Sequence, residues 1–346
     1  MFLYLVNNFM NIFKIGITGA SGLIGEKLCN HCVSRGFEVS CLTRNTENLS
    51  KIKKVKIFQT DLSNPSLEII KKFMSDLDVL FHLASELKVE SKMISSNYLG
   101  TKLLVDEIIN KKTIFVYLSS IGVFDFSSNK IITEKSKKKQ INIYEKTKFQ
   151  CEQYLFKLKR EKKIKFIILR PSIILDYNMK SKIIDRLISV SKKRVKINIS
   201  PDIISNFVLA DDVTFALIKL SQTNKAIGQT FNISSDIPLS IFLQLIRKSL
   251  GKKLYIPISI NYFLGLVKLK LYFFKVKNFK SIISFFSNKC SVSNKKIESF
   301  IGKKINPNYL KFLNVYIQQK KIKKICFVVS SRLTAISFLK EPINRV

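Results

Sequence analysis

Apolar stretches of strand length alternate with segments of helical period over the first half of the chain. A β-type alternation begins at Lys14 and leads into a segment in which Ile24, Leu28 and Cys32 recur at i, i+4 and i+8, which predicts a helix with one buried face. Further strands are predicted at residues 37–42, 54–58, 79–84, 113–119 and 166–169, and further helices at 65–73, 98–109 and 142–158. Strands that alternate with helices at this spacing predict an α/β fold with a doubly wound parallel sheet.

The alternation loosens after Asp176. Helices are predicted at residues 181–193, 211–220 and 239–250, extended segments at 206–209, 230–233 and 252–257, and a buried packing helix at 262–277. We therefore expect a first domain and a smaller second domain. The first covers residues 10–175, with about 205–233 returning to it, and the second covers 176–204 and 234–312.

The two ends of the chain differ from its middle. Residues 1–9 are apolar but too short to span a membrane, and Met10 stands just before the first strand, so we interpret them as a possible upstream extension. Residues 313–346 contain a Lys-rich run and an apolar patch that is also too short to span. Three interpretations of this basic and apolar tail stay open: a docked tail, a membrane-surface contact and a frame artefact.

The charge of the chain is strongly basic. Its formal net charge of +36 comes from 60 Lys and Arg against 24 Asp and Glu, and such a balance can indicate a nucleic acid or an anionic membrane as partner. Here lysine is spread through almost every segment, which is typical of AT-rich coding bias, and neither a basic stripe nor a nucleic-acid-binding signature stands out. We expect no nucleic-acid partner, although the positive field favours anionic ligands such as nucleotides. A hydrophobic content of 46% indicates a folded globular protein.

Three glycines, Gly19, Gly22 and Gly25, stand between the first strand and its helix. Glycine permits backbone conformations and close approaches that a side chain prevents. The free N–H groups at a helix N-terminus and the positive end of the helix dipole attract an anion. This order of strand, glycine turn and helix predicts a dinucleotide whose pyrophosphate lies on the turn, in preference to a plain strand-to-helix turn.

Six cysteines are scattered along the chain. Cys29 and Cys32 have the spacing of a metal or redox motif, but no second pair exists and both lie on the helix after the glycine turn. Buried helix thiols are the preferred interpretation, so no metal site is expected. Nothing suggests disulfides, which favours a reducing compartment, and we expect a cytoplasmic protein.

A second constellation lies on the predicted long helix. Tyr144 and Lys148 are at i and i+4 and so share one face, and a strand that ends at Ser119 and Ser120 precedes them. A Tyr with a pKa of about 10 cannot act as a base at neutral pH. An adjacent Lys ammonium and an oxidised nicotinamide would lower that pKa, so that the phenolate accepts a proton from a substrate hydroxyl. The alternative is a surface Tyr and Lys on a Lys-rich helix.

Several motifs in a fixed order make the chain resemble a known family over about residues 14–305. It resembles the extended short-chain dehydrogenase/reductases, specifically the NAD-dependent epimerase/dehydratase group. The motifs are the glycine turn from Thr18 to Gly25, the Asp61-Leu62 pair, His82 to Ser85, Asn97 to Thr101, Ser119-Ser120, Tyr144 with Lys148, Leu169 to Pro171, and Phe207 to Val213. They are specific for the family but not for a substrate.

The resemblance implies a Rossmann domain that binds NAD or NADP, followed by a C-terminal substrate-binding domain. It implies Ser120, Tyr144 and Lys148 as catalytic residues, with Ser119 as the fallback for Ser120, and Asn97 as a structural or cofactor-side residue. The implied cofactor-binding residues are Gly19, Ser21, Gly22, Leu23, Ile24, Gly25, Thr43, Arg44, Asp61, Leu62, Leu83, Ala84, Tyr144, Lys148 and Pro171.

Three departures from the family pattern change what it implies. NAD-preferring members carry an acid where this chain has Thr43 and then Arg44, and an Arg suits a 2′-phosphate, so we expect NADP in preference to NAD. Asp176 and Tyr177 replace a common glycine, so the resemblance does not predict the substrate loop that follows. Ile121 follows Ser120 where dehydratases of the family place acidic residues, which disfavours 4,6-dehydration.

These observations favour an epimerase or reductase that acts on a nucleotide sugar through a Tyr/Lys/Ser proton relay and hydride transfer. One alternative is a reductase of a hydrophobic, steroid-like or flavonoid-like ketone, because few Arg residues beyond Asp176 could hold a diphosphate. The other is a non-catalytic dinucleotide-binding sensor, although such proteins usually lose the Tyr or the Lys. We also expect a homodimer.

Overall fold

The computed structural model describes residues 14–330, except 48, 50, 51, 53, 128–130, 180, 193, 194, 199–202, 252–255 and 260–288. The described residues belong to two compact units. The first unit contains those of residues 1–175, 206–236 and 288–306, and the second contains those of 176–205, 237–287 and 307–346.

A seven-stranded sheet forms the centre of the first unit. Its strands are β1 (Lys14–Thr18), β2 (Glu38–Thr43), β3 (Val55–Gln59), β4 (Val79–His82), β5 (Ile114–Leu118), β7 (Lys165–Pro171) and β11 (Gln229–Ile233). They lie in the order β11-β7-β5-β4-β1-β2-β3, and every ladder is parallel. The strand order reverses between β1 and β4, which is where doubly wound sheets bind ligands at their carboxyl ends. The predicted Rossmann-like α/β fold is confirmed.

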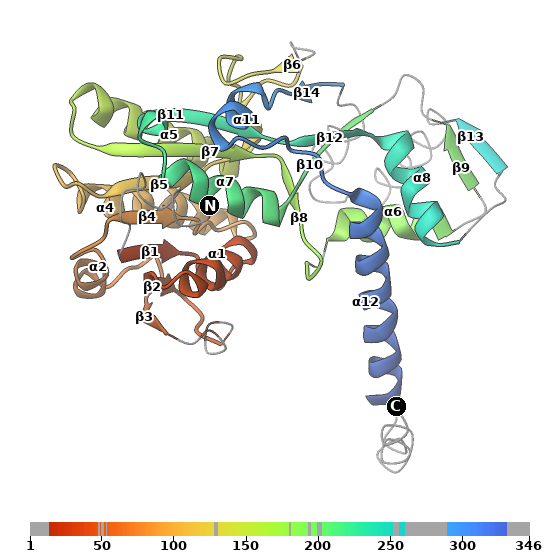
Figure 1. The fold of residues 1–346 in the computed structure, drawn as a ribbon, viewed down its shortest axis with the longest axis horizontal. Helices are drawn as coiled ribbons and strands as arrows, with labels where there is room; N and C mark the ends of the chain where they lie inside the picture. The colour runs from red at the N-terminus through yellow and green to blue at the C-terminus, as the bar shows by residue number, and fades with distance from the viewer. Residues whose placement is uncertain are drawn as a thin grey trace, which may run out of the picture. The chain divides into compact units, whose positions relative to one another are not determined.

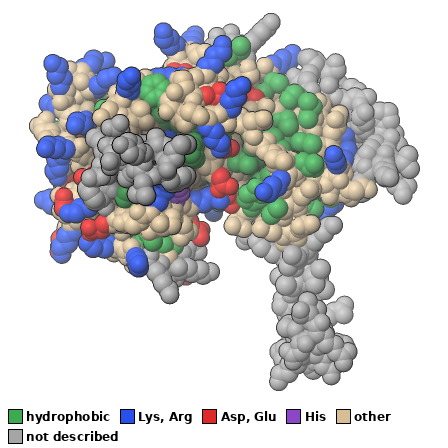
Figure 2. All heavy atoms as spheres, in the orientation of Figure 1, with side chains coloured by type: hydrophobic (Ala, Val, Ile, Leu, Met, Phe, Trp, Pro, Cys, Tyr) green, Lys and Arg blue, Asp and Glu red, His purple; other side chains and the backbone are tan. Residues whose placement is uncertain are grey.

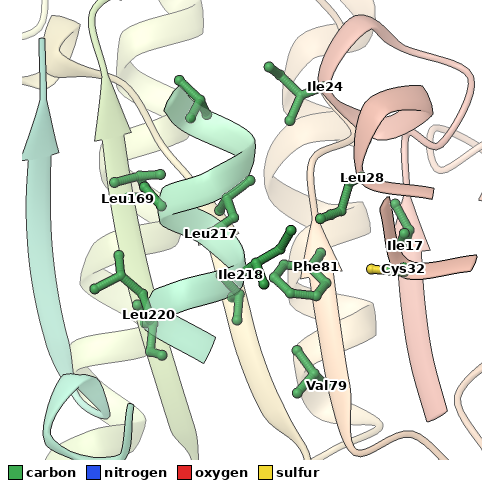
Figure 3. Packing of buried hydrophobic residues seen from close by; sticks show 14 of the residues in the cluster. Ile17, Ile24, Leu28, Cys32, Val79, Phe81, Leu169, Leu217, Ile218 and Leu220 are labelled. Atoms are coloured by element: carbon green, nitrogen blue, oxygen red, sulfur yellow. The ribbon is translucent and has the colours of Figure 1, made fainter. Parts of the chain in front are cut away.

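Helices cover both faces of this sheet (Figure 1). On one face α1 (Leu23–Ser34), α7 (Ala210–Ser221) and α11 (Lys295–Ile301) pack on alternate strand residues such as Ile17 and Phe81 (Figure 3). On the other face α2 (Leu67–Phe73), α4 (Gly100–Asp106) and α5 (Ile143–Arg160) pack on the intervening residues, such as Leu80 and Phe115. Strands buried on both faces have continuous apolar sequences, which is why the pattern of the chain predicted them.

The helix predicted at residues 98–109 starts earlier than expected. Helix α3 (Glu90–Met93) leads into a π-helical turn at Ile94–Leu99, which continues into α4. Short strands complete the unit: β6 (Ile131–Ile132) pairs with β14 (Ser291–Val292), and β8 (Ile173–Leu175) pairs with β10 (Ile204–Leu209), next to β12 (Ser235–Pro238). A 3-10 turn at Ile121–Val123 follows β5.

The second unit contains α6 (Lys182–Lys192), α8 (Leu239–Ser249), α12 (Tyr309–Ser330) and the paired strands β9 (Val195–Asn198) and β13 (Ile256–Ser259). Aromatic rings join α12 to its neighbours: Tyr309 lies edge-on against Phe242 of α8, and Phe312 lies against Tyr177. Helix α12 runs across residue 313, where the tail is predicted to begin. Residues 1–9, the predicted packing helix at 262–277 and residues 331–346 lie outside the described residues.

The basic side chains do not gather into one patch on the face of the described residues that Figure 2 shows. On the face that Figure 2 shows, Lys and Arg side chains are scattered among uncharged and acidic ones. None of the helices that the structure describes is long and apolar enough to cross a membrane. Cys29 and Cys32 are buried in the core of the first unit, as predicted for helix thiols.

Candidate active site

The turn between β1 and α1 is tight. Gly19 has a φ of +67°, in the left-handed region that favours glycine, and its N–H donates to the Leu42 carbonyl at 3.0 Å. A Cβ on Gly19 would lie 2.7 Å from the backbone nitrogen of Ala84, and one on Gly25 would lie 2.3 Å from the Gly19 carbonyl oxygen. Side chains are excluded at both positions, so backbone atoms pack directly against one another there.

Helix α1 starts on this turn without a side-chain cap. Its N-cap is Gly22, which has no side chain that could cap the N–H groups of the first helical turn. Leu23 and Ile24 open the helix, and the side chain of Ile24 is buried in the core, so only its backbone faces the turn. Uncapped N–H groups at the positive end of a helix dipole fit a pyrophosphate.

A chain of hydrogen bonds links the end of β1 to α4. The Thr101 hydroxyl donates to the Asn97 carbonyl at 2.5 Å, so it accepts from Nε2–H of His82 at 2.7 Å. His82 Nδ1 then accepts from the Thr18 hydroxyl at 2.6 Å, and the Thr18 oxygen accepts from the Ala84 N–H at 3.2 Å. Burial lowers the pKa of His82 to about 3, so the ring stays neutral. The chain fixes the loop after β4, which carries Leu83 and Ala84.

Ser21 and Thr43 join the glycine turn to the end of β2. Their hydroxyl oxygens are 2.8 Å apart. Because Thr43 donates to the Asn45 carbonyl at 2.8 Å, Ser21 is the donor to Thr43. Two predicted cofactor residues from separate segments are thereby in direct contact.

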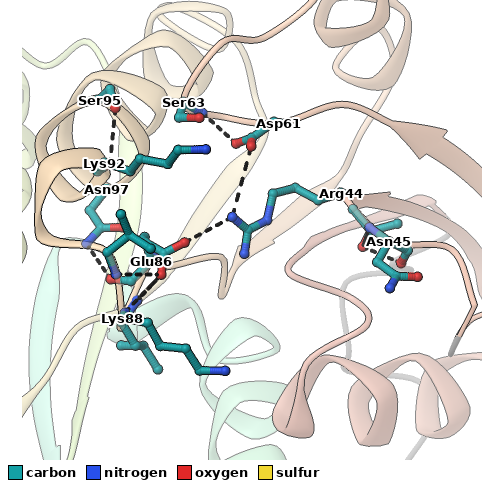
Figure 4. Close-up of polar contacts among 12 residues, drawn as sticks. Arg44, Asn45, Asp61, Ser63, Glu86, Lys88, Lys92, Ser95 and Asn97 are labelled. Carbon is teal, nitrogen blue, oxygen red and sulfur yellow. Dashed lines mark hydrogen bonds and ion pairs between the residues drawn. The ribbon is translucent and has the colours of Figure 1, made fainter.

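Arg44 lies next to Thr43 and reaches two carboxylates (Figure 4). Its Nη1 donates to Glu86 Oε2 at 3.0 Å and lies 4.0 Å from Asp61 Oδ2. Burial disfavours the charge on Asp61, but the N–H and hydroxyl of Ser63 and the charges of Arg44 and Lys92 outweigh it and lower its pKa. The predicted Arg44 and Asp61 are therefore brought together, with Glu86 as a third member.

The side chain of Asn97 bonds the backbone of Glu86, in the loop after β4. Its Oδ1 accepts from the Glu86 N–H at 2.6 Å, and its Nδ2 donates to the Glu86 carbonyl at 3.0 Å and to Thr147 of α5 at 3.4 Å. This geometry gives Asn97 a structural role. Leu62 is also buried, and its carbonyl approaches Gly100 so closely that a Cβ there would lie 2.8 Å away.

Tyr144 and Lys148 lie on one face of α5, as predicted. Lys148 is buried, its Nζ donates to the Leu118 carbonyl at 2.8 Å, and it lies 5.8 Å from the centre of the Tyr144 ring. Burial lowers the pKa of Lys148 to about 8. Burial, with Glu145 adding to it, raises the pKa of Tyr144 to about 12. Without a bound cofactor, Lys148 does not produce the expected lowering of the Tyr144 pKa, because the Tyr144 side chain is desolvated, although only half-buried, and the ammonium is bonded to a strand carbonyl.

The two serines after β5 have different surroundings. Ser119 is buried and its hydroxyl donates to Glu152 Oε1 at 2.6 Å. Ser120 is half-buried and its oxygen accepts from the Gly122 N–H at 3.1 Å. A Cβ on Gly122 would lie 3.0 Å from the Glu145 side chain, so the turn that carries Ser120 packs on the first turn of α5. Ser120 is thus the serine with the more exposed hydroxyl.

A buried ion pair joins α5 to β7 next to Ser119. Arg170 donates from Nε and Nη2 to the two carboxylate oxygens of Glu152, both at 2.7 Å, and each side chain is 2% exposed. Pro171 follows Arg170 at the end of β7 and pairs with Ile233 of β11. The pair ties α5, which carries Tyr144, to the carboxyl end of the sheet.

Residues 15–234 match the NAD dependent epimerase/dehydratase family. The chain belongs to this family. Among curated relatives, ADP-L-glycero-D-manno-heptose-6-epimerase of Brachyspira hyodysenteriae is 24% identical over 158 residues, which are 43% of this chain and 50% of that protein. Human dTDP-D-glucose 4,6-dehydratase is 23% identical over 222 residues, 60% of this chain and 63% of that protein. The chain therefore matches between half and two thirds of the length of these relatives.

A solved structure agrees with the fold of this epimerase/dehydratase-family chain. UDP-glucuronic acid 4-epimerase from Bacillus cereus, in complex with NAD, superposes with a TM-score of 0.69 at 17% sequence identity. The superposition covers 89% of this chain and 97% of that one. This likeness shows the fold.

Four residues of this epimerase/dehydratase-family site were not assigned a role from the sequence. His82 and Arg170 lie within motifs that were recognised, but their partners are distant in sequence. Glu86 directly follows the His82 motif, and Glu152 lies one helical turn beyond Lys148. The only sequence signal was position: each is a polar residue in or beside a segment that is otherwise buried.

Proposed function

We propose that this protein is an NAD(P)-dependent epimerase or reductase that acts on a nucleotide sugar. The observation that carries the proposal is the placement of Tyr144 and Lys148 on one face of α5, with Lys148 bonded to the last residue of β5 and Ser120 on the turn that packs against Tyr144's helical turn. Such a phenol and ammonium at the carboxyl edge of a doubly wound sheet suit proton transfer to and from a hydroxyl.

The glycine turn fits a dinucleotide, because a Cβ at Gly19 or Gly25 would fill the turn and the first N–H groups of α1 are uncapped. Gly19, Gly22 and Gly25 would hold the pyrophosphate, with Asp61, Leu62, Leu83 and Ala84 along the adenine and ribose. When bound, the nicotinamide supplies the hydride acceptor or donor. Arg44 at the end of β2 favours NADP over NAD, since a guanidinium suits a 2′-phosphate.

The residues of α5 then divide the proton chemistry. Tyr144 is protonated in the free protein, because burial raises its pKa to about 12, so it can donate a proton to a substrate oxygen. It accepts a proton in the reverse direction once positive charge beside it lowers that pKa. Lys148 supplies a buried ammonium near the ring, and the Ser120 hydroxyl holds the substrate oxygen on its other side.

The substrate side of the proposal concerns the second unit. We keep it as the substrate-binding domain that the family resemblance implies. Ile121 and Gly122 follow Ser120, so no carboxylate stands where a dehydratase would need one.

A homodimer is part of the proposal. One short segment carries four exposed apolar side chains, Leu87, Val89, Ile94 and Leu99.

The test is a screen of the purified full-length protein with UDP- and dTDP-sugars, following NAD(P)H absorbance and sugar isomers together. Isomerisation without net absorbance change identifies an epimerase, and net absorbance change identifies a dehydrogenase or reductase. Tyr144→Phe is expected to lower turnover by at least about a hundredfold with little change in cofactor affinity. Tyr154→Phe, on the same helix and bonded to Asp106, is the matched control and should keep turnover.

Three results would contradict the proposal. Full activity of Tyr144→Phe would exclude the phenol as the proton-transfer group. Cofactor binding without turnover of any sugar nucleotide, combined with turnover of an apolar ketone, would identify a reductase of a hydrophobic substrate. Retained cofactor binding with no turnover of either class would identify a dinucleotide-binding sensor.

A further inference from the structure

The guanidinium of Arg44 is shared between two carboxylates, Asp61 in the segment after β3 and Glu86 in the segment after β4 (Figure 4). Arg44 is half exposed, at 52%, while the Glu86 side chain is 7% exposed. The Glu86 contact is a hydrogen bond of 3.0 Å, whereas the Asp61 contact is 4.0 Å long and on a more exposed carboxylate. Glu86 is therefore the main partner of Arg44.

Glu86 is held in place independently of Arg44. Its Oε1 accepts from the backbone N–H groups of Leu87, Lys88 and Val89, at 2.9–3.3 Å. Its own backbone is fixed on both sides by the amide of Asn97. The N–H of Lys88, with the Arg44 charge and other N–H groups, lowers the pKa of Glu86 to about 2, so the carboxylate is charged at every physiological pH.

A 2′-phosphate at Arg44 would enter a site that already has negative charge. A phosphate monoester adds a charge of about −1.5 to −2 at pH 7 and seeks charge-assisted hydrogen bonds from a guanidinium. The same guanidinium nitrogen, Nη1, serves both Glu86 and Asp61. The phosphate must either displace Glu86 from Arg44 or lie beside its immobile carboxylate, and both lower its affinity.

We propose that Glu86 sets the cofactor preference by holding Arg44 in an ion pair, which weakens the binding of NADP relative to NAD. Arg44 alone would strongly favour NADP, and Glu86 reduces that margin. The inference rests on the proposed function only in that the site binds a nicotinamide dinucleotide. Glu86 is a positioning residue here, because it acts through the guanidinium of Arg44.

The test compares the dissociation constants of NAD and NADP for the full-length protein by calorimetry. Glu86→Gln keeps the oxygen that accepts the three backbone N–H groups but removes the charge. It is expected to tighten NADP binding by about tenfold, equivalent to about 1.4 kcal/mol, and to leave NAD binding within about twofold. Glu68→Gln removes the same charge from the exposed surface pair with Lys72 and should change neither constant.

A double-mutant cycle separates coupling through Arg44 from a structural effect. In an Arg44→Met background, Glu86→Gln should change the ratio of the NADP and NAD constants much less than it does beside Arg44, because only the direct repulsion between the carboxylate and the phosphate remains. A merely structural role would move both constants together in either background. If Glu86→Gln loses its fold, Glu86→Asp, whose shorter side chain withdraws the carboxylate from Arg44, should still shift the ratio toward NADP, though by less.

Three results would overturn the inference. The first is weaker NADP binding by Glu86→Gln, which would show that Glu86 orients Arg44 for the phosphate instead of competing with it. The second is that Glu86→Gln and Glu86→Asp both leave the ratio of NADP to NAD affinity unchanged, or that both abolish NAD binding. The third, failure of the wild-type protein to bind either cofactor, would overturn the proposed function as well and so differs from the first two.

Discussion

Removing the charge of Glu152 is expected to destabilise the first unit strongly. Glu152 and Arg170 are each 2% exposed and joined by two hydrogen bonds of 2.7 Å, and Ser119 adds a third to the same carboxylate. In Glu152→Gln the guanidinium keeps its charge but loses its counter-charge inside the protein. Breaking a buried pair by removing one partner costs about 3–5 kcal/mol.

The assay is urea unfolding of Glu152→Gln followed by far-UV circular dichroism, with thermal unfolding in parallel. A loss of about 3 kcal/mol corresponds to a fall of at least about 6 °C in the midpoint for a unit of this size. The matched control is Glu161→Gln at the end of the same helix. Its pair with Lys163 is exposed and screened by solvent, so the substitution should leave the unfolding midpoint close to that of the wild type.

A double variant distinguishes the effect of the two charges on stability from the effect of the packing around them. Glu152→Leu combined with Arg170→Met removes both charges and fills the space with apolar groups, so it should be less destabilised than Glu152→Gln. The guanidinium also stacks on Phe124, with its central carbon 5.0 Å from the ring centre, and the Met side chain can keep that contact. A Glu152→Gln protein within about 1 kcal/mol of wild type would refute the reasoning, since it would show that the charge of Arg170 needs no partner.

Three further predictions concern the glycine turn and its surroundings. Between pH 8 and 5 the unfolded chain protonates His82 at its ordinary pKa, whereas the folded chain, in which its pKa is about 3, does not. The free energy of unfolding should therefore fall by about 2 kcal/mol on acidification, and unfolding curves of His82→Gln should lack this fall. Gly25→Ala places a Cβ 2.3 Å from the Gly19 carbonyl and should weaken cofactor binding by at least about tenfold in calorimetry. Arg44→Glu should shift the ratio of NADP to NAD affinity toward NAD by at least about tenfold.

Each of these three has a comparison that can contradict it. His31→Gln should keep most of the pH dependence, and equal slopes for His82→Gln and wild type would disprove the buried neutral ring. Gly22→Ala, whose Cβ would meet the Gly19 carbonyl at 3.1 Å, should be milder than Gly25→Ala. An NADP/NAD ratio that Arg44→Glu leaves unchanged would remove Arg44 from the cofactor site.

The inner strands of the sheet could be predicted from the sequence because their apolar pattern reflects burial on both faces. The strand predicted at 37–42 is β2 at Glu38–Thr43, and the one predicted at 113–119 is β5 at Ile114–Leu118. The glycine turn could be predicted from its spacing between a strand and a helix, although the structure requires Gly19 both for its positive φ and for its approach to Ala84, 65 positions away. In both cases the pattern that reveals the feature lies within a few residues of it, whereas the packing that requires it extends further.

The elements that escaped prediction depend on distant partners. The early start of the helix at Glu90 was missed because the stretch up to Asn97 is rich in serine, and its buried polar residues are satisfied only in the folded chain. The ring of His82 is held by Thr18, which is 64 positions away, and Glu86 meets Arg44 across 42 positions. No local pattern contains these pairs.

Two Arg–Glu ion pairs, Arg170 with Glu152 and Arg44 with Glu86, differ in exposure, and this difference decides whether an anion from solution can separate them. Arg170 and Glu152 are both buried, so separating them would leave a charge inside the protein, and the pair acts as a fixed joint between α5 and the sheet. Arg44 and Glu86 differ: the carboxylate is buried and immobile, but the guanidinium is half exposed and can be hydrated when it leaves. An anion from solution can therefore compete for Arg44 but not for Arg170. The exchangeable pair lies at the end of β2, where a dinucleotide on the glycine turn would place its ribose. The fixed pair joins α5 to β7, and its movement would displace Tyr144, the proposed proton-transfer group.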